Sequence, residues 1–62
     1  MVTEALYKHV KRGTIYRVLN FATLQVEGPL DESIVVVYQD VDSLRVWVRP
    51  QSEFFDGRFE EL

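Results

Sequence analysis

Aromatic and cationic side chains share one face around the only tryptophan of the chain. If this stretch is an extended strand, Arg45, Trp47 and Arg49 point to the same side, because side chains alternate along a strand. An indole ring offers a flat stacking surface, and guanidinium groups donate paired hydrogen bonds to phosphate or carboxylate groups. The pattern predicts a recognition surface for a flat or anionic group. The alternative is that the tryptophan belongs to the core and the two arginines pair with Glu53 and Asp56.

Other aromatic and polar side chains lie on segments that alternate in the same way, and strand pairing would gather several of them at one surface. The predicted binding residues are therefore Tyr7, His9, Tyr16, Arg45, Trp47 and Arg49. A nucleotide needs both stacking and phosphate contacts, and protein interfaces also favour tryptophan, tyrosine and arginine. The residue types leave these two kinds of partner open.

Signatures of catalysis are missing from the sequence. A metal site needs several ligands that converge, and His9 with Asp40 or Asp42 would be an incomplete set. The three serines lie where turns commonly use serine, and the three glycines lie in three separate turns, so they cannot form a phosphate-binding loop. Asp40 and Asp42 are best interpreted as solvated turn residues. We therefore predict a non-enzyme, with no catalytic residue, metal site or cofactor.

The length of 62 residues predicts one domain, residues 1–62, with 47% hydrophobic and 13% aromatic residues to build its core. No cysteine is present, so neither a disulfide nor a thiolate metal site can stabilise the fold. Ordering a chain costs about 1.5 kcal/mol per residue, which apolar burial must offset. The domain is therefore expected either to close a compact barrel or to gain burial as a homo-oligomer.

The net charge of −3 argues against general binding to nucleic acid, which depends on clustered lysine and arginine. The first third of the chain is basic and its tail is acidic, so the two ends are expected to neutralise each other. No secretory signal and no apolar run long enough to span a membrane is visible. With the lack of cysteine, this predicts a cytoplasmic protein without a membrane partner.

Strand patterns dominate the chain. The expected strands cover residues 5–10, 14–26, 34–38, 44–49 and 58–60. The second is longer than a usual strand, so a bend is expected near Asn20 and Ala22. Residues 39–43 are expected to form a polar turn, and Asp56-Gly57 indicates a type I′ turn. The pattern predicts an all-β fold, a small five-stranded antiparallel SH3-like barrel with room for one 3₁₀ turn after Pro50. An open meander stacked on a second copy is the alternative.

The order of several short motifs resembles a family of small bacterial and bacteriophage domains of unknown function. The matching positions are Tyr7-Lys8-His9, Lys11, Gly13, Tyr16-Arg17-Val18-Leu19, Ala22, Val36-Val37-Tyr38, Trp47-Val48-Arg49-Pro50 and Phe54-Phe55. The resemblance covers residues 6 to 55 and implies an SH3-like barrel from a prokaryotic or phage source. It implies no established activity. Asn20 stands where this family usually has glycine, and the loop over residues 25–33 is longer.

Three functions remain open after these considerations. The first is a small, phage-encoded binding module that acts on a host or phage protein. The second is an oligomeric anti-defence protein that sequesters a nucleotide signal. The third is a nucleic-acid-binding SH3-like barrel, which the acidic balance of the chain disfavours.

Overall fold

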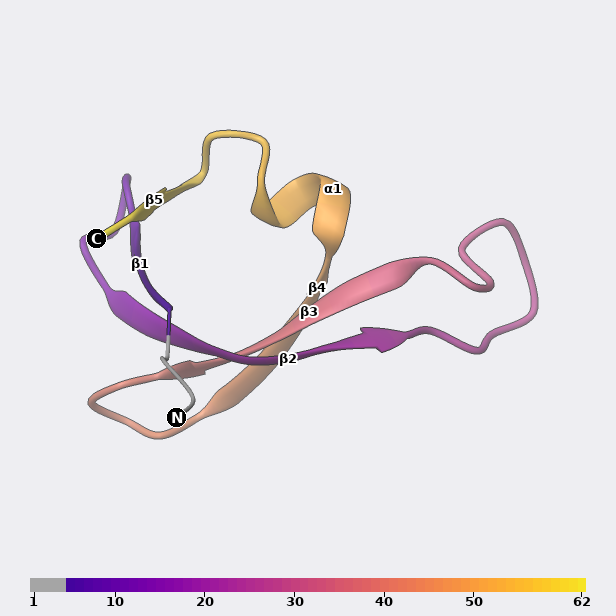
Figure 1. Cartoon of the computed structure of the whole chain (residues 1–62), viewed down its shortest axis with the longest axis horizontal. Helices are drawn as coiled ribbons and strands as arrows, with labels where there is room; N and C mark the ends of the chain where they lie inside the picture. Colours follow the sequence, from indigo (N-terminus) through magenta and orange to yellow (C-terminus); the bar gives the residue numbers. More distant parts are fainter. Residues whose placement is uncertain (1–4) are drawn as a thin grey trace.

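Residues 5–62 contain five antiparallel strands and one helical turn (Figure 1). A computed structural model describes residues 5–62, so residues 1–4 of the predicted domain lie outside it. The elements are β1 (Leu6–His9), β2 (Ile15–Thr23), β3 (Ile34–Asp40), β4 (Val46–Pro50), α1 (Gln51–Phe54) and β5 (Phe59–Glu61). The strands form one sheet in the order β4-β3-β2-β1-β5. The prediction of an all-β chain with five antiparallel strands is confirmed. No helix in the described part is long and apolar enough to cross a membrane.

The sheet is strongly curved but does not close. Its outer strands are β4 and β5, and α1 connects them along the chain. Figure 1 shows β5 beside β1 and α1 near β3 and β4, whereas the loop between β2 and β3 extends away from the rest. The predicted closure into a barrel is therefore not confirmed. The outer strands β4 and β5 are not hydrogen-bonded to each other, and α1, with its fully buried Phe54, lies between them along the chain.

β2 contains the irregularity that the long strand-prone run predicts. It is nine residues long, shorter than expected, and its register with β3 shifts between Val18 and Asn20. Val18 lies opposite Tyr38 and Asn20 opposite Val37, so Leu19 is an extra residue, which is a β-bulge.

The bulge changes which side chains of β2 face inward. Phe21 lies opposite Val36, and residues directly opposite each other in an antiparallel pair share a face. Tyr16, Val18 and Phe21 therefore point to the same side of the sheet, although simple alternation would separate Phe21 from the other two.

The turn between β3 and β4 lies two residues later in the chain than predicted. β3 continues through Asp40 and β4 begins at Val46, so the expected strand start at Leu44 is wrong. The carboxylate of Asp40 accepts the backbone N–H groups of Asp42 at 2.8 Å and Ser43 at 3.1 Å, which lowers the pKa of Asp40. Leu44 adopts a φ of 65°, a left-handed conformation that ends the turn. Asp40 thus has the role of a turn residue.

The connection from β4 to β5 differs from its prediction. Residues 51–54 form a short α-helix rather than a 3₁₀ turn. A type I′ turn needs a positive φ at both central residues, but of Asp56 and Gly57 only the glycine has one, at 105°. β5 then pairs with β1, where Lys8 lies opposite Glu60. After the Asp56-Gly57 turn, β5 therefore pairs with β1. It does not form a hairpin with the segment before the turn.

Aromatic side chains form most of the core. The buried cluster contains Tyr16, Val36, Tyr38 and Phe54, with Tyr7, Val18 and Phe59 packed against it. Phe54 stacks on Phe59 with ring centroids 4.2 Å apart and meets Tyr38 edge-on at 5.2 Å. Because the rings of this cluster come from four strands and α1, they hold the curved sheet and the helix together.

Candidate functional site

The inner face of the sheet opens into a small cavity beside the core, which we call the aromatic hollow. Its volume is about 180 Å³, and it is lined by His9, Arg12, Tyr16, Tyr38, Trp47, Arg49 and Phe59. Strand pairing explains why these residues meet. Tyr38 lies directly opposite Trp47 in the β3–β4 pair, and His9 lies opposite Phe59 in the β1–β5 pair. The hollow therefore joins strands from both ends of the chain.

The rings around the hollow contact one another edge-to-face. Tyr16 meets Tyr38 with centroids 5.2 Å apart and Phe59 at 5.8 Å, and His9 meets Phe59 at 5.0 Å. Tyr16 and Tyr38 are themselves buried. Buried, interlocked rings lose little freedom when a ligand binds, so they form a rigid wall for a flat group.

Trp47 stands on the surface rather than in the core. Its side chain is 39% exposed, and the guanidinium of Arg45 lies 4.4 Å from the centre of its ring. Arg49 stacks over Phe59 at 5.6 Å. Of the two acidic residues that the sequence offered as partners for these arginines, Glu53 lies 3.4 Å and Asp56 3.2 Å from Arg58 instead. These two carboxylates therefore pair with Arg58 and not with Arg45 or Arg49.

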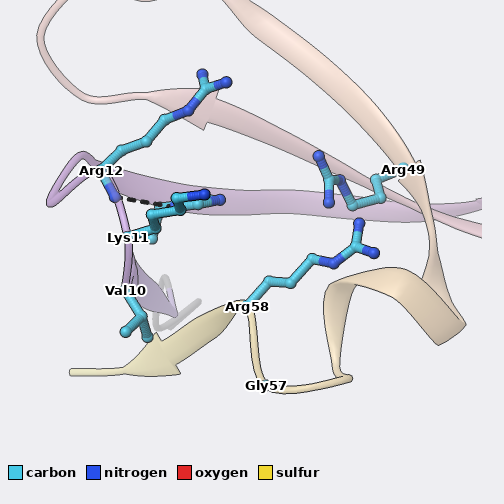
Figure 2. Close-up of a pocket in the computed structure, with 7 residues that line it drawn as sticks. Val10, Lys11, Arg12, Arg49, Gly57 and Arg58 are labelled. Carbon is cyan, nitrogen blue, oxygen red and sulfur yellow. Dashed lines mark hydrogen bonds between the residues drawn. The ribbon is translucent and has the colours of Figure 1, made fainter.

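A second, larger cavity adjoins the first, and we call it the basic hollow. It has a volume of about 560 Å³ and is lined by His9, Val10, Lys11, Arg12, Arg49, Gly57 and Arg58 (Figure 2). The turn after β1 brings in Lys11 and Arg12, and the backbone N–H of Val10 binds the carbonyl oxygen of Arg58 at 3.0 Å. His9, Arg12 and Arg49 line both hollows, so the aromatic and cationic surfaces are continuous.

His9 lies between the two hollows in a strongly cationic environment. Partial burial lowers the pKa of His9 below its ordinary value, and the charges of Arg12, Arg49, Arg58 and Lys11 lower it further. The Nδ1 atom of His9 accepts the backbone N–H of Arg12 at 3.1 Å. A neutral imidazole that accepts at Nδ1 carries its proton at Nε2, so His9 offers one N–H donor at neutral pH.

We expect His9 to titrate below its usual pKa of about 6.5 when its imidazole signals are followed by NMR. The assignment is unambiguous because the chain has one histidine. A depressed pKa means that the unfolded chain binds the proton more readily. This contribution to stability is therefore complete above about pH 6.5 and is lost as the pH falls towards the folded pKa.

The Arg49→Gln variant should shift the titration of His9 upward, because it removes one of the charges that oppose protonation. Lys8→Gln is the matched control, since Lys8 is exposed and is not among the residues that shift His9. A His9 that titrates at or above pH 6.5 in the wild type would contradict this description of the site.

Four of the predicted binding residues come together. His9, Tyr16, Trp47 and Arg49 all line the aromatic hollow, whereas Tyr7 and Arg45 do not. Tyr7 packs under α1, with its ring 5.1 Å from that of Phe54, and burial raises its pKa. Arg45 does not line the hollow, and its guanidinium contacts the site by stacking on the indole of Trp47.

The sequence patterns missed several lining residues, namely Lys11, Arg12, Tyr38, Phe59 and Arg58. Tyr38 could have been found by pairing the two strands of the predicted hairpin, which places it opposite Trp47. The others depend on the contact between β1 and β5, which no local pattern encodes.

Within residues 5–62, no group of three or more histidine, cysteine, aspartate or glutamate side chains could hold a metal ion. One serine hydroxyl has a clear structural use, since Ser43 Oγ accepts the backbone N–H of Arg45 at 3.2 Å in the β3–β4 turn. What the described groups offer is therefore stacking and charge-assisted hydrogen bonding.

Comparison with known proteins identifies the family. No curated protein and no solved structure matches the chain. Residues 5–60, nearly the full length, match the family described as a protein of unknown function, DUF1653. Because the match covers nearly the whole chain, with four complete strands, most of β5 and every residue that lines the two hollows, the chain belongs to the DUF1653 family.

Proposed function

We propose that this domain is a small, non-enzymatic binding module that recognises a segment of another protein through the aromatic hollow. The segment would insert a flat side chain against Trp47, Tyr16 and Phe59, and place a negative group near Arg49. The observation that supports this most is the exposure of Trp47 above a wall of buried rings. Tryptophan, tyrosine and arginine at one rigid surface are the residue types that dominate binding energy at protein interfaces.

The proposed setting is the cytoplasm of a bacterial cell, with a host or phage protein as the partner. A chain without cysteine suits a reducing compartment. The family resemblance in the sequence motifs supports a phage or bacterial source for the chain.

Selection from a random peptide display library tests this function. We expect enrichment of peptides that combine an aromatic residue with aspartate or glutamate. Trp47→Ala should weaken their binding at least about tenfold, because truncating a central interface tryptophan typically costs about 2 kcal/mol or more.

Val48→Ala is the matched control, since Val48 lies on the same strand, points to the opposite face and is exposed. Its peptide affinity should stay within about twofold of the wild type. Thermal unfolding of both variants checks that they fold. An empty selection, or peptides that bind a folded Trp47→Ala variant as tightly as the wild type, would overturn the proposal.

A further inference from the structure

The basic hollow concentrates positive charge on an otherwise acidic chain. The net charge of the protein is −3, yet four of its seven lysine and arginine residues line this one cavity. These four, Lys11, Arg12, Arg49 and Arg58, come from the turn after β1, from β4 and from the turn before β5. Like charges held together repel each other, so the arrangement favours an anion among them.

Two of the guanidinium groups face each other. Figure 2 shows the side chains of Arg49 and Arg58 pointing towards one another across the cavity. A guanidinium carries five N–H donors in a planar fork that fits the oxygens of a phosphate group. An oxyanion between the two forks would replace repulsion with charge-assisted hydrogen bonds from both sides.

The nearby carboxylates position Arg58 without neutralising the cavity. Glu53 Oε1 lies 3.4 Å from Nη1 of Arg58, and Asp56 Oδ2 lies 3.2 Å from its Nε. The third guanidinium nitrogen, Nη2, has two more N–H groups. Two carboxylates against four cations leave an excess of positive charge at the cavity.

His9 adds a neutral donor at the boundary with the aromatic hollow. Its Nδ1 atom is taken by the backbone N–H of Arg12, which leaves the proton on Nε2. The cavity therefore combines three arginines, a lysine and an imidazole N–H. This number of donors exceeds what one carboxylate with two oxygens can use, and it suits a phosphate group, which has more acceptor oxygens and up to two charges.

From this geometry we infer that the basic hollow is a binding site for a phosphate-type oxyanion, held between Arg49 and Arg58. The inference goes beyond the proposed function, because it concerns a second cavity and needs no partner protein. The cavity volume of about 560 Å³ admits a group larger than a single phosphate. The continuous aromatic hollow would accept a flat group attached to it.

Titration with inorganic pyrophosphate at low salt tests the site directly. We expect saturable one-to-one binding by calorimetry, and Arg49→Gln and Arg58→Gln should each weaken it about tenfold. Glu53→Gln should strengthen binding, because it removes a carboxylate that competes for Arg58. Lys8→Gln is the matched control for charge, since Lys8 is exposed on the opposite face of β1, and it should change the affinity less than about twofold.

Further arms of the titration identify the source of the phosphate. Adenosine triphosphate that binds more tightly than pyrophosphate and changes the fluorescence of Trp47 would indicate a nucleotide, with its base in the aromatic hollow. Phosphotyrosine that does so would indicate a modified partner protein, and pyrophosphate as the tightest ligand would indicate a free anion. Each of these outcomes supports the site.

Absence of saturable binding by all three probes would overturn the inference, as would equal losses in Lys8→Gln and Arg49→Gln, which would reveal unspecific attraction. The two proposals fail separately. The titration needs no peptide, and peptide selection needs no phosphate.

Discussion

Phe54→Ala is expected to leave the domain largely unfolded at 25 °C. Phe54 is fully buried, stacks on Phe59 at 4.2 Å and meets Tyr7, Tyr38 and Phe55 edge-on. Removing a buried phenylalanine ring costs about 3 to 5 kcal/mol. A single core in a domain of this size supplies about the same amount in total. Far-ultraviolet circular dichroism and urea unfolding measure the outcome.

Phe55→Ala is the natural control for this experiment. Phe55 follows Phe54 directly, and its side chain is 48% exposed. Its loss should reduce the free energy of unfolding by about 1 kcal/mol, and the variant should remain folded. If Phe54→Ala unfolds at the same urea concentration as Phe55→Ala, the arrangement of α1 over the sheet described above is wrong.

Phe59→Ala is expected to damage both stability and binding. Phe59 packs on Phe54, contacts three rings of the aromatic hollow and lies under Arg49 at 5.6 Å. Because Phe59 is only partly buried, we expect the free energy of unfolding to fall by about 2 to 3 kcal/mol, less than for Phe54. Urea unfolding and the affinity of selected peptides measure the two effects.

Phe59→Leu separates the two roles of this side chain. Leucine keeps apolar contact with the core, so most of the stability should return, whereas the flat wall of the hollow is lost and peptide binding should stay weak. Coupling between Phe54→Leu and Phe59→Leu should amount to about 1 kcal/mol, since the two rings stack. Full recovery of peptide affinity in Phe59→Leu would show that ring stacking contributes nothing at this position.

Local sequence patterns predicted which side chains share a strand face, where β3 lies and that β2 is irregular. Alternation placed Trp47 and Arg49 on one face, and the β-branched run of residues 34–38 became the first and larger part of β3. The overlong second run was expected to bend, and the structure places a bulge between Val18 and Asn20. Each of these features depends on residues close in sequence.

The site residues that the sequence did not predict meet through pairing between strands far apart in the chain. The contact between β1 and β5 joins His9 to Phe59, and it brings Arg58 next to the turn after β1. Such a contact depends on the path of α1, where the sequence predicted only a short turn after Pro50. Most of the residues that line the two hollows were therefore not predicted, including Lys11, Arg12 and Arg58 of the basic hollow.

The extra residue in β2 restricts how the length of this protein can change. Upstream of the bulge the inward positions are even-numbered, as in Tyr16 and Val18, and downstream they are odd-numbered, as in Phe21 and Thr23. Deleting Leu19 would remove the bulge and keep the pairs on both sides of it, because Val18 would then be followed directly by Asn20 opposite Val37. A deletion downstream of the bulge would instead turn the following side chains of β2 to the opposite face or break their pairing with β3. Insertions and deletions are therefore tolerable in the projecting loop before β3, where no such phase has to be kept.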